Sequence, residues 1–173
     1  MPTVVTHAAV GLGLASVFAS QPMSPLHWGL SAGLAMLPDL DVLAFRLGIP
    51  YGARFGHRGF SHSLCCALLT SLVVAWLCFE WFGESWWSLW GFFFPVMASH
   101  GILDAFTNGG MGIAFFAPFD NRRYFFAWRP VQVAVIGGPI LHPWNVRAFF
   151  SEIVWIWLPL SLIVGGVTLY RLD

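Results

Sequence analysis

The chain has 173 residues, of which 58% are hydrophobic and only 9% are charged. Soluble domains carry charge on about a quarter of their residues, so this composition excludes an ordinary soluble fold. It predicts a single-domain, all-α integral membrane protein. Eight Arg balance eight acidic residues and Lys does not occur, so no charge excess indicates nucleic acid as a partner. The expected partner is membrane lipid.

A membrane-spanning helix needs about 20 mostly apolar residues, and five segments approach this length. They are predicted at 4–20, 26–37, 62–82, 86–107 and 151–169. Pro38 disfavours a helical conformation in the residue before it, which ends the second helix. Ser61 is the predicted N-cap of the third helix. Segment 111–150 mixes prolines with arginines, so we expect an irregular membrane-proximal loop or lid between the fourth and fifth helices.

The alternation of five spans brings nearly all chemically capable side chains to the membrane face that holds the N-terminus. A carboxylate at bilayer depth costs about 2.5 to 3.5 kcal/mol, so three aspartates on one face require a counter-ion. Imidazoles favour Zn over Mg or Ca as that ion. The opposite face offers only His27, Glu80 and Glu84. The predicted metal ligands are His7, Asp39, Asp41, His57, His62, His100 and Asp104.

Spacing supports this site. His100 and Asp104 are four residues apart on a predicted helix, so their side chains share a face. Asp39 and Asp41 lie side by side if the chain is extended after Pro38, because alternate residues of an extended segment share a side. Which member of the Asp39/Asp41 pair, and which of the two histidines in His57-Arg58-Gly59-Phe60-Ser61-His62, binds a metal directly is left open.

Arginines and one glutamate complete the predicted site. Arg58 either binds a phosphate or sets topology through the positive-inside rule, which places this face in the cytoplasm. Glu152 is interpreted as a ligand, a general base or a partner of Arg147. Catalytic roles are predicted for Glu152 and Arg58, and phosphate contacts for Arg58, Arg122, Arg123 and Arg129.

Five motifs in order along the chain resemble those of the YdjM-like family of membrane-bound metal-dependent hydrolases. They are Thr6-His7, Pro38-Asp39-Leu40-Asp41, residues 57–63, Ser99-His100-Gly101-Ile102-Leu103-Asp104 and residues 121–126. The resemblance implies a distant relation to zinc phospholipase C and P1 nuclease, which cleave phosphoesters with clustered zinc. In that group a His and an Asp four residues apart bind zinc, and here His100 and Asp104 match them.

The same resemblance implies that His7 corresponds to an early histidine ligand. Because the chain lacks a His-x3-His-x3-Glu run, the resemblance implies one or two Zn ions instead of three. We therefore predict an inner-membrane hydrolase that uses metal-activated water on a phosphoester of a lipid or lipid-linked substrate. The alternatives are a small metal-ion transporter or channel and a structural metal-binding membrane module.

Overall fold

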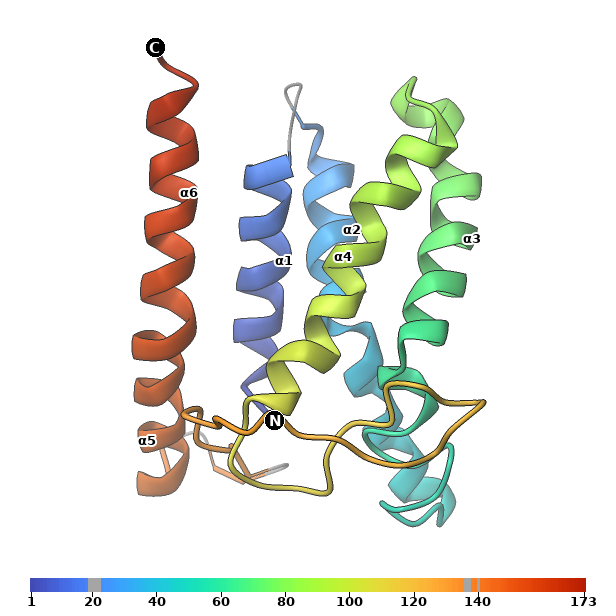
Figure 1. Ribbon diagram of the computed structural model, residues 1–173, viewed down its shortest axis with the longest axis vertical. Coiled ribbons are helices and arrows are strands. Elements are labelled where there is room, and N and C mark those ends of the chain that lie inside the picture. The colour runs from blue at the N-terminus through green and yellow to red at the C-terminus, as the bar shows by residue number, and fades with distance from the viewer. Residues whose placement is uncertain (19–22, 136–137, 140) are drawn as a thin grey trace.

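The computed structural model describes residues 1–18, 23–135, 138–139 and 141–173, and the described chain is all-α (Figure 1). Figure 1 shows the helices side by side, with the long connections from α2 to α3 and from α4 to α5 at the end that holds the N-terminus and the C-terminus at the opposite end. The α-helices are α1 Val4–Phe18, α2 Pro25–Met36, α3 Leu64–Phe82, α4 Trp86–Ala105, α5 Pro143–Glu152 and α6 Leu158–Tyr170. The predicted end of the first helix at Ser20 lies outside the described residues.

Helix α4 is central to the packing, because α1, α2 and α3 all pack against it. Buried apolar side chains such as Leu34, Phe93 and Met97 fill the space between α2, α3 and α4. Helices α1 and α2 approach closely at Gly11, where an added Cβ atom would lie 2.5 Å from the Ser31 carbonyl oxygen. Small residues at such contacts are typical of helix packing in membranes.

The segment after α2 differs from the prediction. Instead of an extended strand, Leu37–Leu47 forms a 3-10 helix, η1. Pro38 begins this helix, where its missing N–H group costs nothing. With three residues per turn, positions two apart point in different directions. The prediction that Asp39 and Asp41 lie side by side on an extended segment is therefore wrong.

The start of α3 also differs from the prediction. Phe60–His62 forms a single 3-10 turn, η2, and α3 begins at Leu64. The N-cap is Ser63, whose hydroxyl accepts a hydrogen bond from the backbone N–H of Cys66 at 3.0 Å. The predicted cap, Ser61, donates its hydroxyl to Asp41 instead. The competing carboxylate explains why the cap moves two residues along the chain.

The last helix begins earlier than predicted. Helix α5, a π-helical stretch at Ile153–Trp157 (η3) and α6 follow one another without a break over residues 143–170. The predicted irregular segment 111–150 is thus wrong over its last eight residues. Proline is well tolerated in the first turn of a helix, and Pro143 occupies that position. Residues 107–135, here called the strap, stay irregular and pair through isolated bridges such as Thr107 with Val131.

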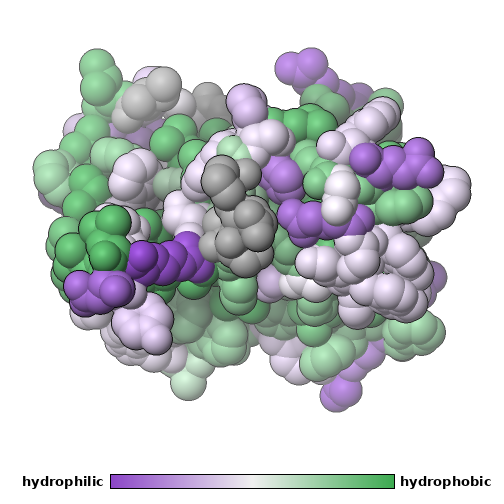
Figure 2. Space-filling view, turned by 90° about the horizontal axis from the view of Figure 1, so that it is seen from above, coloured by the Kyte–Doolittle hydropathy of each residue, from purple (hydrophilic) through white to green (hydrophobic). Residues whose placement is uncertain are grey.

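Two of the described helices are long and apolar enough to cross a membrane, namely Leu64–Phe82 and Pro143–Tyr170. Helix α1 is apolar but shorter. Helix α6 contains no buried residue, and Leu162 on it is 77% exposed. Such continuous apolar exposure requires a non-aqueous environment. Figure 2, viewed from the C-terminal end of the bundle, shows hydrophobic and pale surface with scattered hydrophilic side chains.

Candidate metal centre

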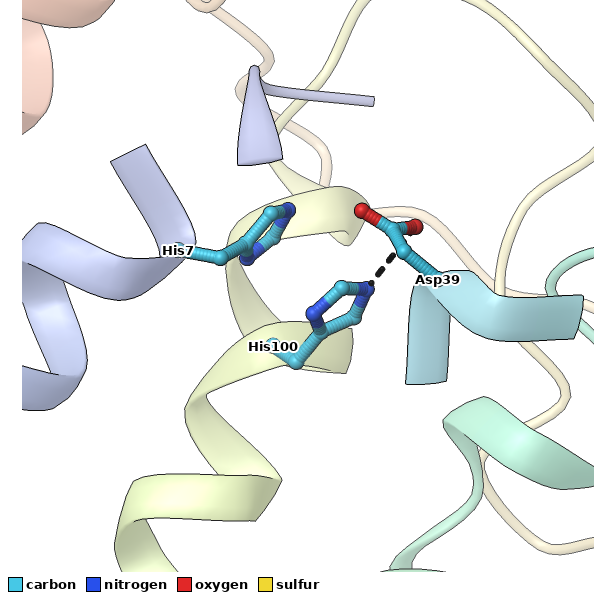
Figure 3. Close-up of side chains that lie close together, drawn as sticks. All are labelled: His7, Asp39 and His100. Atoms are coloured by element: carbon cyan, nitrogen blue, oxygen red, sulfur yellow. Dashed lines mark ion pairs between the residues drawn. The ribbon is translucent and has the colours of Figure 1, made fainter. Parts of the chain in front are cut away.

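All seven predicted ligands gather at the end of the bundle where the loops lie. Among the described residues, buried His and Asp side chains form three overlapping groups, and within each group the ligand atoms lie within 4.8 Å of one another. The groups are His7 with Asp39 and His100, Asp39 with His57 and His62, and His62 with His100 and Asp104. Figure 3 shows the first group, whose members come from α1, η1 and α4. The structure brings these side chains together, and their role as metal ligands stays a prediction.

Local structure positions each side chain. His100 and Asp104 lie one helical turn apart on α4 and point to the same side, as predicted. His7 lies in the first turn of α1, and its ring stacks on that of His100 with centroids 3.7 Å apart. Gly101 lets the turn that carries His62 approach α4, because a Cβ there would lie 2.7 Å from the His62 carbonyl oxygen.

Three histidines are held through their Nδ1 atoms. His57 Nδ1 lies 2.6 Å from one oxygen of Asp41, and His62 Nδ1 lies 3.1 Å from the other. His100 Nδ1 lies 2.7 Å from the carbonyl oxygen of Ala35. If each Nδ1 carries the proton, each ring presents an unprotonated Nε2 atom, which is the form that binds metal.

The atoms that face inward lack partners. Among the described residues, His57 Nε2, both nitrogens of His7 and the carboxylate oxygens of Asp39 and Asp104 are buried without a hydrogen bond. Buried polar groups are nearly always paired, so such a concentration indicates a missing partner. A divalent cation would pair with the carboxylate oxygens and with each ring nitrogen that carries no proton.

The distances also fit a metal. His62 Nε2 lies 3.0 Å from His100 Nε2 and 3.5 Å from an oxygen of Asp104, and His100 Nε2 lies 3.3 Å from an oxygen of Asp39. Ligands bound tetrahedrally at the usual zinc distances are about 3.3 Å apart. The residues present therefore fit one or two divalent ions of the zinc type.

Both carboxylate oxygens of Asp41 accept hydrogen bonds from protein groups, whereas those of Asp39 accept none from the described residues. The two oxygens of Asp41 accept from His57, from His62, from the backbone N–H of Arg58 at 3.1 Å and from the Ser61 hydroxyl. Burial raises the pKa of Asp41, but the hydrogen bonds from His57 and His62 outweigh it and hold the pKa below its usual range. Asp41 is thus placed to orient two histidines, whereas Asp39 is placed to bind an ion.

Arg58 is fully buried and has a left-handed backbone with φ of 64°. Its Nε atom lies 3.0 Å from an oxygen of Asp104, and its two terminal nitrogens donate to the Gly109 carbonyl and the Thr107 hydroxyl. A left-handed residue costs about 1 to 2 kcal/mol, which these buried bonds offset. Arg58 was predicted to hold a phosphate, but its guanidinium is already bonded to these three protein groups.

The other predicted arginines have different environments. Arg123 donates to the carbonyl oxygens of His57 at 3.0 Å and Tyr51 at 3.1 Å, so it braces the loop that carries His57. Arg122 is exposed and pairs with Asp120 at 2.7 Å. Arg129 is exposed, and its guanidinium lies over the ring of Phe125 at 4.8 Å. Only Arg122 and Arg129 are placed to receive a ligand without breaking buried bonds.

Glu152 lies outside the three His/Asp groups of the described residues. Its carboxylate accepts from the Thr3 backbone N–H at 2.8 Å, from the Thr3 hydroxyl at 2.6 Å and from the Thr6 hydroxyl. It therefore ties α5 to the first turn of α1, which carries His7. No ion pair joins it to Arg147 in the described chain. Its role as a general base stays a prediction.

Sequence reasoning missed several supporting groups. Ser61, Thr107 and the Ala35 carbonyl hold Asp41, Arg58 and His100 respectively. A signal was present for two of them, because Ser61 stands directly before His62 and Thr107 follows Asp104 by three residues, one turn later. The backbone carbonyl of Ala35 had no sequence signal, since any residue supplies one.

The fold and the site together define a helical membrane protein with a buried, metal-competent His/Asp cluster at one end of its bundle. The model of the YdjM inner membrane protein family matches residues 1–172, and the chain belongs to this family. It is 38% identical over 166 residues to the inner membrane protein YbcI of Escherichia coli K12, covering 95% of this chain and 96% of that protein. No solved structure matches. The predicted family and inner-membrane location are confirmed.

Proposed function

We propose that this inner-membrane protein is a metal-dependent hydrolase of a phosphoester in a lipid or lipid-linked substrate. The observation that carries the proposal is the set of buried imidazole and carboxylate atoms left without partners at one end of the helices. The location supports a lipid substrate, because the cluster lies where the helices meet the loop layer, the level expected for lipid head groups.

The proposed ligands are the Nε2 atoms of His57, His62 and His100 with the carboxylates of Asp39 and Asp104, and His7 as a further donor. A bound divalent ion of the zinc type lowers the pKa of a coordinated water to about 7 and polarises a phosphoryl oxygen.

The protein's own groups would preorganise that chemistry. Asp41 fixes the protonation and direction of two rings, and Arg58 compensates the charge of Asp104 through its Nε atom at 3.0 Å. Arg123 holds the carbonyl of His57 and so fixes the loop. Arg122 and Arg129 are the exposed cations proposed to contact the substrate phosphate and the charge that develops on it.

Two topological features belong to the proposal. We place α1, α2, α3, α4 and the continuous helix 143–170 in the membrane as five spans. By the positive-inside rule, the seven arginines of the loop-bearing end place the site at the cytoplasmic face.

The test uses the full-length chain in lipid nanodiscs. Hydrolysis of bis(p-nitrophenyl) phosphate and of bilayer phospholipid is measured with and without a chelator, for wild type and for Asp104→Asn. Asp173→Asn, which alters an exposed carboxylate at the opposite end of the bundle, is the matched control. We expect the chelator and Asp104→Asn to abolish hydrolysis and the control to retain it. Hydrolysis that survives both treatments would overturn the proposal.

A metal transporter is the rival function, and one observation favours it. At the far end of the bundle, His27 Nε2 lies 3.7 Å from an oxygen of Glu84, a second pair of ligand types. Between the two ends, buried apolar side chains such as Leu34, Phe93 and Met97 fill much of the space. Zinc flux into proteoliposomes that is lost in His100→Ala would nevertheless reverse the ranking.

The third alternative is a purely structural metal. In that case the metal-free protein melts at a much lower temperature and no substrate is hydrolysed at any metal concentration. Thermal unfolding in detergent, read beside the hydrolysis assay, separates this outcome from the proposed one.

A further inference from the structure

An apolar groove of about 250 Å³ lies beside the metal centre and takes no part in it. Its walls come from α1 at Val10, from the end of α4 at Leu103 and Phe106, from the strap at 128–131 and from the last helix between Trp155 and Ile163. Every lining residue is apolar or aromatic.

The groove begins next to the metal ligands. Val10 follows His7 by three residues on α1, and Leu103 directly precedes Asp104 on α4. Val131 forms a bridge with Thr107, whose hydroxyl holds Arg58. One end of the groove and the candidate site therefore share the same turns of two helices.

From this end the groove extends along the last helix. Trp155 and Ile163 are eight residues apart, which corresponds to about 12 Å along a helix axis. Trp128 of the strap meets Trp155 edge-on with ring centroids 5.0 Å apart and closes the end near the loops. The other end reaches Ile163, which is 55% exposed on the apolar helix α6. The groove thus leads from the strap toward the hydrocarbon region.

The strap carries a cation next to this end of the groove: Arg129 is not itself a lining residue, and its guanidinium lies over the ring of Phe125. Arg129 lies between Trp128 and Pro130, which both line the groove, and its side chain is exposed. Within the described ranges it has no carboxylate within ion-pair distance. An apolar channel with a cation at one end matches a molecule that has an apolar tail and an anionic head.

The lining of the groove selects the type of tail. Because every lining side chain is apolar or aromatic, the groove offers almost no hydrogen-bond partner to a polar ligand. An extended hydrocarbon chain is narrow enough to enter, and the surrounding bilayer supplies it.

We propose that this groove binds one acyl chain of a glycerophospholipid, with Arg129 at its head-group phosphate and the metal centre beside the head group. The inference rests on the proposed function only in naming the substrate class. It predicts that lipid occupies the groove whether or not the lipid is cleaved.

The test is photo-crosslinking of the full-length chain in nanodiscs with a phosphatidylglycerol that carries a diazirine on one acyl chain. We expect crosslinked peptides from residues 155–163. Ile163→Trp fills the open end and should reduce this crosslinking to background. Leu162→Trp adds the same indole to the adjacent, outward-facing position and should retain the wild-type yield. Equal yields in the two variants would overturn the proposal.

Arg129→Gln tests the head-group end. It should weaken labelling by phosphatidylglycerol about two- to fivefold, as expected for an exposed ion pair, and leave labelling by an uncharged diacylglycerol probe unchanged. A disulfide-linked dimer of an Ile163→Cys variant, in place of lipid labelling, would instead show a second protein chain in the groove and overturn the proposal.

Failure of the groove and failure of the proposed function give different results. Hydrolysis of water-soluble bis(p-nitrophenyl) phosphate by the wild-type chain tests the metal chemistry alone. Hydrolysis without groove labelling refutes the groove only, whereas groove labelling without any hydrolysis refutes the proposed function only. Zinc content of each variant, measured by mass spectrometry, shows that the site is intact in both crosslinking variants.

Discussion

Asp41→Asn is the substitution that tests the internal logic of the metal centre. One carboxylate oxygen of Asp41 accepts a hydrogen bond from His57 at 2.6 Å. The other oxygen accepts from His62, from the Arg58 backbone N–H and from the Ser61 hydroxyl. An asparagine at this position has one acceptor oxygen and one donor NH₂ group. The oxygen is expected to stay on the side with three donors, so the NH₂ group faces His57.

The substitution changes which nitrogen of His57 carries the proton. To accept from an NH₂ group, His57 must lose its proton at Nδ1 and carry it at Nε2, the atom that points to the candidate ion. Loss of a residue that orients a metal-bound histidine typically costs 10- to 100-fold in metal affinity, which is about 1.4 to 2.7 kcal/mol. We expect the zinc dissociation constant of Asp41→Asn to rise by this amount.

The assay is zinc competition with a chromophoric chelator on the detergent-solubilised full-length chain. His57→Ala and the double variant Asp41→Asn/His57→Ala complete a double-mutant cycle. Because Asp41→Asn is expected to act through His57, the double variant should bind zinc about as weakly as His57→Ala alone. Fully additive losses, or an Asp41→Asn variant with wild-type affinity, would refute the reasoning.

Further substitutions test the supports of the site by thermal unfolding in detergent. Arg58→Gln leaves the Asp104 carboxylate buried without its cation and should destabilise the metal-free chain by about 3 to 5 kcal/mol, with much of the loss recovered when zinc is added. Glu152→Gln should lower stability by about 1.5 to 3 kcal/mol and leave zinc affinity unchanged; a loss of affinity would instead indicate a role at the metal. Ser63→Ala removes the N-cap of α3 and should cost about 1 kcal/mol, whereas no cost would show that the cap is elsewhere. Gly11→Ala forces α1 away from α2 and should cost about 1 to 3 kcal/mol, and an unchanged melting temperature would contradict the close approach.

The gathering of the ligands could be predicted from sequence because it depends on simple geometry. Alternating spans place the ends of successive helices on alternate faces, and a four-residue spacing on a helix places His100 and Asp104 on one side. Neither inference requires knowledge of a side-chain contact.

The roles within the cluster could not be predicted in the same way. The choice between Asp39 and Asp41 depends on a 3-10 helix that includes Pro38, and a proline is equally compatible with an extended segment. The role of Arg58 depends on its left-handed backbone and on two distant acceptors in the strap, the Gly109 carbonyl and the Thr107 hydroxyl, for which the local sequence gives no signal. Such contacts are set by tertiary packing.

The start of the last helix also could not be predicted from the composition of residues 111–150. Prolines and arginines made 111–150 read as irregular throughout, yet Pro143 is placed where a proline favours a helix start. Only the tertiary structure shows that Glu152, just beyond this range, contacts the start of α1 and lies outside the His/Asp groups.

The central claim is that the buried His/Asp cluster binds catalytic metal. A crystal structure of the full-length chain grown with zinc, with anomalous diffraction recorded on both sides of the zinc edge, tests it most directly. We expect one or two zinc peaks within bonding distance of the Nε2 atoms of His62 and His100 and of the carboxylates of Asp39 and Asp104, with Asp41 bonded only to histidines, Arg58 and Ser61. The absence of zinc from the cluster, or zinc bound only elsewhere on the protein, would contradict the account.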